Sequence, residues 1–195
     1  MTAIYLAPWR VDVTVRDSVM DAHGGRRPIA VRPLVRAIAA ALDAGGAPAP
    51  AAISLILSGD PELAELNATH LGHDGPTDVL SFPLLPSVAF PAHDGGRDRD
   101  RDASQSAAAL FAGPPGHRIQ LGDIILSVER AAEQAAAGRG GQTGDVRWSV
   151  ADELRLLVTH GALHICGWDH AEPAEELAMR ELEQRLLAAA PPRKK

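Results

Sequence analysis

One stretch near the C-terminus decides how this chain folds: Thr159-His160-Gly161-Ala162-Leu163-His164-Ile165-Cys166-Gly167-Trp168-Asp169-His170. Its first two histidines are four residues apart, so they lie about 40° apart around a helix and both imidazoles can reach one ion. Gly167 is well placed to end that helix in a left-handed turn, which would reverse the chain and return His170 to the same ion. The stretch therefore predicts a metal site made of His160, His164 and His170, on a central helix and the turn after it.

Two other interpretations of the three histidines are weighed against a catalytic site. They could be unrelated, since a lone histidine on an apolar helix face is usually a packed core residue. They could also belong to a closed structural zinc site, but such a site normally needs a fourth protein ligand, typically cysteine. Cys166 is the only cysteine of the chain, and it lies about 200° around the helix from His164. Three histidines with an open fourth position favour a catalytic zinc, which lowers the pKa of its bound water toward about 7.

Each of the two acidic residues considered near the histidines, Asp169 and Glu153, has a functional and a structural interpretation. The spacing equals that of the metzincin protease pattern H-E-x-x-H-x-x-G-x-x-H, but Gly161 occupies the position of the glutamate that serves a peptidase as its base. Asp169 either acts in catalysis, by orienting a ligand or accepting a proton, or it caps the turn or faces water. Glu153 lies two helical turns before His160 and either orients that histidine or, as we expect, is a surface charge.

Working outward, hydrophobic periodicity predicts an α+β fold with a small mixed sheet of about four strands and about five helices. The clearest strand is 9–15, where apolar residues alternate with polar ones. The other expected strands are 53–57, 78–84 and 119–126. The expected helices are 33–43, 60–71, 127–137, 149–166 and one that begins near Pro173.

Between two of these strands, residues 86–118 are rich in Ala, Gly, Pro, Asp and Arg and have no sustained apolar period. We predict a disordered insertion here, although a functional arm is the alternative. Residues 1–190 are expected to form a single domain, and 191–195 a basic tail.

Composition restricts the setting in which this chain works. Its single cysteine excludes an intramolecular disulfide, and neither a signal-like segment near Met1 nor an apolar stretch long enough to span a membrane is present in the sequence. We therefore expect a cytoplasmic protein with no membrane partner. The net charge of −6 argues against nucleic-acid binding over the whole surface, so any contact with RNA must be local.

Three segments resemble the YbeY endoribonuclease family. Residues 160–170 match its signature H-G-x-L-H-[LI]-x-G-[YW]-D-H at every defined position. Residues 76–83 resemble the family's P-T-[DN]-V-L-S-F-P strand, and residues 121–124 resemble its L-G-D-[IL] strand. The resemblance implies a zincin-like domain that holds one zinc ion per chain. It also implies cleavage of single-stranded RNA, with the 16S rRNA precursor as the substrate, in 3′-end maturation and ribosome quality control. The implied partner is the ribosome or its small subunit, and no DNA substrate is expected.

The chain departs from the family pattern after Asn67. Family members commonly show N-x-x-Y-R-G-x-D, and Leu71 stands where that arginine, thought to serve RNA binding or catalysis, is expected. His70 and His73 flank the change and either donate to phosphate when protonated or are ordinary exposed histidines. Two other functions therefore stay open: another zinc hydrolase such as a peptidase, and a noncatalytic ribosome-assembly factor stabilised by zinc.

Overall fold

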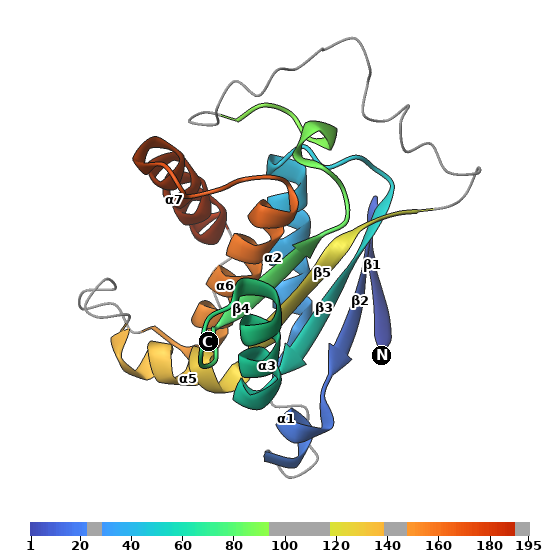
Figure 1. Ribbon diagram of the computed structural model, residues 1–195. Helices are drawn as coiled ribbons and strands as arrows, with labels where there is room; N and C mark the ends of the chain where they lie inside the picture. The colour runs from blue at the N-terminus through green and yellow to red at the C-terminus, as the bar shows by residue number, and fades with distance from the viewer. Residues whose placement is uncertain (23–28, 94–117, 139–147, 190–195) are drawn as a thin grey trace.

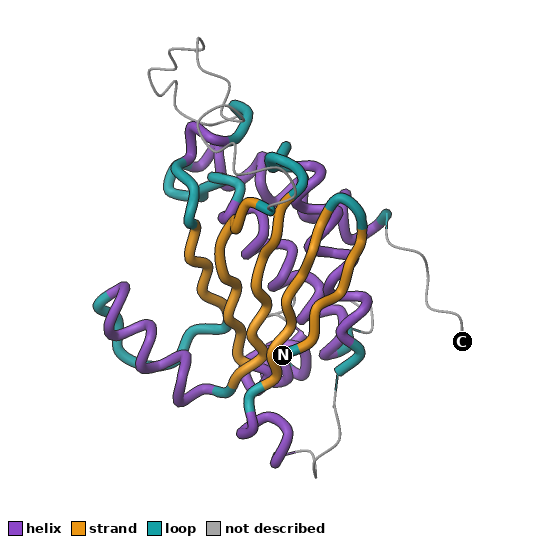
Figure 2. Tube along the Cα trace, turned by 90° about the vertical axis from the view of Figure 1, so that its right-hand side faces the viewer, coloured by secondary structure: helices purple, strands orange, loops and turns teal. Residues whose placement is uncertain are grey.

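The computed structural model describes residues 1–22, 29–93, 118–138 and 148–189, and a mixed sheet of five strands lies at its centre (Figure 1). The strands are β1 (Thr2–Leu6), β2 (Trp9–Val15), β3 (Ala51–Ser58), β4 (Val79–Pro83) and β5 (Ile119–Ser127). They lie side by side in the order β1-β2-β3-β5-β4 (Figure 2). β2, β3 and β5 are parallel, whereas the two outer strands are antiparallel to their neighbours.

Six α-helices and one short 3-10 helix are described around this sheet. They are α1 (Asp17–Ala22), α2 (Val31–Ala44), α3 (Asp60–Leu71), η1 (Ser87–Ala89), α5 (Val128–Ala136), α6 (Val150–Ile165) and α7 (Pro173–Ala188). Figure 1 shows α2 and α6 on one face of the sheet and α3 on the other. α7 packs against α6 and α2, so the helical layer is thicker on the α6 face.

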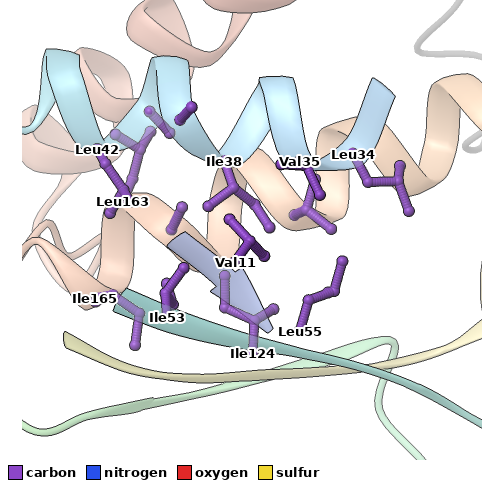
Figure 3. Close-up of a cluster of buried hydrophobic side chains, with 14 of the residues drawn as sticks. Val11, Leu34, Val35, Ile38, Leu42, Ile53, Leu55, Ile124, Leu163 and Ile165 are labelled. Carbon is purple, nitrogen blue, oxygen red and sulfur yellow. The ribbon is translucent and has the colours of Figure 1, made fainter. Parts of the chain in front are cut away.

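The sheet separates two hydrophobic cores, because successive residues of a strand point to opposite faces. Leu55 of β3 and Ile124 of β5 belong to the main core beneath α2 and α6, which Figure 3 shows. Their neighbours Ile56 and Ile125 belong to a smaller cluster with Leu63 of α3. The α+β class predicted from the sequence is confirmed, with α2 and α6 on one face of the sheet and α3 over β4 and β5 on the other.

The expected strand count was one too low, because β1 was not recognised. Thr2–Leu6 alternates between half-buried and exposed residues, and it pairs antiparallel with β2 at the edge of the sheet. A five-residue edge strand buries little, so its apolar signal is weak beside that of β2, where Trp9, Val11 and Val13 are all nearly inaccessible. The predicted strand 9–15 coincides with β2.

The capping residues in the sequence predicted where α5 and α6 begin and where α3 ends. Ser127 accepts a hydrogen bond from the backbone N–H of Arg130 at the start of α5, and Ser149 forms a reciprocal capping box with Asp152 at the start of α6. α3 ends at Leu71 and Gly72 follows in a left-handed conformation (φ 69°). These local interactions satisfy backbone groups that a helix end leaves free, which is why sequence reasoning finds them.

The predicted insertion 86–118 lies mostly outside the described residues, as does the basic tail 191–195. Its first residues are described and pack on the domain: Ala89 and Phe90 are buried in the main core. The His93 ring stacks on that of Trp168, with centroids 4.2 Å apart. Residues 86–93 therefore pack on the folded domain, and the disordered insertion stays a prediction.

No helix in the described parts of the chain combines the length and the apolar character that crossing a membrane requires.

Candidate metal centre

α6 carries His160 and His164 on the side of the sheet that holds the main core, and a glycine lets it approach β4 closely. The Ser81 hydroxyl of β4 donates a hydrogen bond to the Gly161 carbonyl, at 3.1 Å. A Cβ on Gly161 would lie 2.9 Å from the Ser81 oxygen and 3.1 Å from Cγ2 of Ile124. The space that a metzincin glutamate would need at this position is thus filled by the sheet.

The turn after α6 brings the third histidine back, as the sequence predicted. Gly167 has a φ of 83°, in the left-handed region that favours glycine. The Gly167 N–H donates to the His164 carbonyl at 3.0 Å, and the Trp168 N–H donates to the Leu163 carbonyl at 3.1 Å. These two bonds close the helix end and direct the following residues toward the helix face that carries the histidines.

The three imidazoles meet in one cluster that could hold a metal ion. One nitrogen from each of His160, His164 and His170 lies within 4.8 Å of the other two. The Nε2 atoms of His160 and His164 are 3.0 Å apart, and the His170 ring stacks beside that of His160 with centroids 5.6 Å apart. His160 and His164 are half-buried and His170 is exposed, so the cluster opens to solvent on one side.

Hydrogen bonds on the outer nitrogens fix the tautomers of the first two histidines. Nδ1 of His160 lies 2.6 Å from Oε1 of Glu183, and Nδ1 of His164 lies 2.8 Å from the Trp168 carbonyl. A carboxylate and a carbonyl can only accept, so both Nδ1 atoms carry the hydrogen and both Nε2 atoms present lone pairs. When both rings are neutral, the two Nε2 lone pairs face each other at 3.0 Å, an arrangement that a positive charge between them, a proton or a metal ion, stabilises. This donor set therefore fits a metal ion.

Burial keeps the central ligand in the form that metals bind. Loss of solvent, together with the neighbouring His160 and His170, lowers the pKa of His164 to about 4. His164 is consequently a neutral imidazole at neutral pH, as coordination requires.

Cys166 is turned away from the histidines. Its side chain packs against Gly45 at the end of α2, where an added Cβ would come within 2.7 Å of the sulfur. Burial raises the pKa of its thiol to about 12, so no thiolate is present to bind metal at neutral pH. Among the residues that the structure describes, no fourth histidine, cysteine or carboxylate joins the three histidines, which leaves a coordination position for solvent or substrate.

A cleft of about 820 Å³ lies beside the cluster, between α6, α7 and β4, and His160 and His170 line it. Trp148, Arg180 and Gln184 are among its other walls. Asp169, named from the sequence as a candidate catalytic acid, accepts a hydrogen bond from the His170 N–H at 2.7 Å. That contact joins adjacent residues of the turn, and a catalytic role for Asp169 stays a prediction.

The weak candidates His70, Leu71 and His73 come from the other side of the sheet. The His70 ring packs edge-on against Phe82, a residue of the smaller α3 cluster, with centroids 5.0 Å apart. Leu71 is 56 % exposed at the end of α3. None of the contacts found among the described residues joins these three to the histidine cluster.

The expectation that Glu153 is a surface charge is wrong. Glu153 is fully buried, and its carboxylate accepts a hydrogen bond of 2.6 Å from the Trp148 indole. An acidic residue suits this position, because the first turn of α6 is the positive end of the helix dipole. The carboxylate on His160 comes instead from Glu183, which sequence reasoning missed. The sequence held one signal for it: Glu183 is next to the apolar stripe of Met179, Leu182 and Leu186 on the last helix, so its side chain lies near the face that packs on the domain.

Comparison with known proteins agrees with the signature residues. The family model described as Endoribonuclease YbeY matches residues 28–190. This chain belongs to the YbeY endoribonuclease family. A YbeY endoribonuclease from Salinispora tropica is 42 % identical over 76 % of this chain and 80 % of its own length. One from Mycobacterium tuberculosis is 39 % identical over 70 % of this chain and 63 % of its own length.

A solution structure of a protein from Thermotoga maritima covers 91 % of this chain and 86 % of its own, with 19 % identity and a TM-score of 0.45.

Proposed function

We propose that this YbeY family member is a zinc-dependent endoribonuclease that cleaves single-stranded RNA. The observation that carries the proposal is the cluster of three histidine nitrogens beside an open cleft, in which the Nε2 atoms of His160 and His164 are 3.0 Å apart. Two imidazole nitrogens on one tetrahedral zinc ion lie about 3.3 Å apart, close to this separation. His160, His164 and His170 would hold the ion, one per chain.

When bound, zinc with an open position supplies a hydroxide at neutral pH and stabilises negative charge on a phosphoryl oxygen. The chain contributes the orientation of the three ligands: Glu183 and the Trp168 carbonyl set two of them, and Asp169 fixes the backbone of the third. The exposed side of His170 faces the cleft, where the scissile phosphate of a substrate would enter.

The walls of the cleft suit an unpaired nucleotide. Trp148 offers an aromatic face on which a base can stack, and its indole N–H is held by the buried Glu153. Arg180 is a cation within the cleft, ion-paired with Glu176 at 2.5 Å. Contacts confined to one cleft agree with the net charge of −6, which opposes binding along the whole surface.

The more specific part of the proposal rests on the family alone. We propose that the RNA is the 16S rRNA precursor, cleaved during 3′-end maturation and quality control on the small ribosomal subunit in the cytoplasm. A single, buried and free cysteine is consistent with that reducing compartment.

A peptidase is disfavoured by the packing of Gly161. The metzincin base would have to project from this position, and Ser81 and Ile124 occupy its space. A noncatalytic assembly factor is the second candidate, favoured by Leu71, since the family's arginine is missing at an exposed position.

The test is metal analysis and hydrolysis on one purified sample. We expect about one zinc per chain, cleavage of a labelled single-stranded RNA, little cleavage of the same RNA in a duplex, and none of casein. Activity should disappear with a chelator and return with zinc. Zinc without cleavage of any RNA would support the assembly factor, casein hydrolysis would support the peptidase, and absence of bound metal would contradict the proposal.

A further inference from the structure

Glu183 is the one α7 residue in direct hydrogen-bond contact with the histidine cluster among the contacts found in the described residues. Its carboxylate lies 2.6 Å from Nδ1 of His160, although the two residues are 23 positions apart in the chain. The Glu183 side chain is only 12 % exposed and that of His160 is 29 % exposed, so solvent competes weakly for this bond. A charge-assisted hydrogen bond in such surroundings is stronger than one at the surface.

We propose that Glu183 is a positioning residue that holds His160 ready for metal and links metal binding to the docking of α7. By accepting the Nδ1 hydrogen, the carboxylate keeps the lone pair on Nε2, the atom that faces His164. It also fixes the rotation of the ring and increases the basicity of Nε2 toward a cation. The inference rests on the proposed function in one respect, that the three histidines bind zinc.

The link to α7 follows from the narrow face by which that helix packs on the domain. Met179, Leu182 and Glu175 are buried and Leu186 is partly buried against the main core, while Leu177 is 60 % exposed. Another polar connection runs from the Arg155 guanidinium of α6 to the Leu187 carbonyl at 3.1 Å. Because Glu183 bonds a metal ligand, a bound ion strengthens a contact that α7 needs, and a docked α7 strengthens the ion's ligand.

The experiment compares zinc affinities by competition with a chromophoric chelator. Losing a hydrogen-bond partner of a metal ligand typically weakens affinity about 10- to 100-fold, and we expect that loss for Glu183→Ala. Glu183→Gln keeps a neutral acceptor and should fall between Glu183→Ala and the wild type. Glu181→Ala is the matched control, because Glu181 is an exposed carboxylate on the same helix, and its affinity should be unchanged.

A second readout uses the metal-free proteins and needs no activity. At about pH 8, where an ordinary histidine of pKa about 6.5 is neutral, nitrogen-15 shifts report which ring nitrogen carries the hydrogen. We expect the Nδ1–H form for His160 in the wild type and in Glu181→Ala, and a mixture of tautomers in Glu183→Ala. Hydrogen exchange should show that zinc protects α7 amides in the wild type and protects them less in Glu183→Ala.

The outcomes separate the two proposals. A wild type that binds no zinc contradicts the proposed function, while the tautomer measurement still decides the role of Glu183. Zinc binding by Glu183→Ala within twofold of the wild type, or an equal loss in Glu181→Ala, overturns the inference. If Glu183→Ala does not fold, Glu183→Gln decides in its place, and wild-type affinity with an unchanged tautomer overturns the inference.

Discussion

The two faces of the sheet differ in how sequence distance relates to contact. On the α6 face, His160 meets His164 from the same helix and Glu183 from α7, 23 residues away, all at 3.0 Å or less. On the α3 face, His70 and Leu71 lie a few residues before β4 in the chain. Val79 and Ser81 of β4 face α6, but His70 contacts Phe82, a β4 residue that faces α3. Proximity along the chain is therefore a poor guide to the site wherever a strand intervenes.

The largest expected effect is on the α6 face. His164→Ala should remove bound zinc and RNA cleavage together, because two imidazoles bind the ion poorly. His73→Ala, which removes an exposed histidine just beyond α3, is the control and should keep its zinc. Zinc content is measured by elemental analysis of dialysed protein. Unchanged zinc in His164→Ala would show that the histidine cluster on the α6 face is not the metal site.

Gly161→Glu tests the contact that brings α6 to β4. We expect it to destabilise the fold by more than about 3 kcal/mol, because it overpacks a filled space and buries a charge there. Val150→Glu adds the same group at an exposed position of the same helix and should change stability by less than about 0.5 kcal/mol. Urea unfolding measures both, and equal stabilities would mean that α6 can move away from the sheet.

Leu71→Arg asks whether the α3 face can reach the site around the edge of the sheet. β4 is the outer strand, and the cleft begins at Asp78 and Val79, seven and eight residues beyond Leu71. A guanidinium beside a scissile phosphate stabilises the charge of the transition state, so we expect cleavage to rise about tenfold with zinc content constant. Leu177→Arg, also at an exposed leucine, should leave the rate unchanged. An unaltered rate in Leu71→Arg would show that a side chain at position 71 does not act at the histidine cluster.

Arg180→Ala should give the smallest effect. Arg180 is 59 % exposed and paired with Glu176, so its contribution to RNA binding is reduced by solvent and by that pairing. We expect an increase in KM of about fivefold, with kcat unchanged and a shallower dependence of binding on salt. Arg185→Ala, an exposed arginine of α7 that is not among the residues lining the cleft, is the control. Equal effects of the two substitutions would place the RNA outside the cleft.

Local sequence patterns predicted the helix ends and turns whose hydrogen bonds and backbone conformation depend only on neighbouring residues. Ser149 and Asp152 cap α6 through bonds between near neighbours, and Gly167 reverses the chain because only glycine takes its φ of 83° without strain. Local patterns did not predict β1, because an edge strand of five residues is buried mainly by its pairing with β2. The packing of residues 86–93 likewise has no local signal, because Phe90 is buried by the main core and not by its own neighbours.

The sequence by itself determined that His160, His164 and His170 come together, because helical periodicity and one glycine turn fix their geometry within eleven residues. Tertiary structure alone decided which groups surround them. Glu183 reaches His160 only when α7 docks on α6, and Glu153 is buried beneath Trp148 instead of facing water. Contacts between separate helices depend on the packing of whole apolar faces, and no spacing within one helix contains that information.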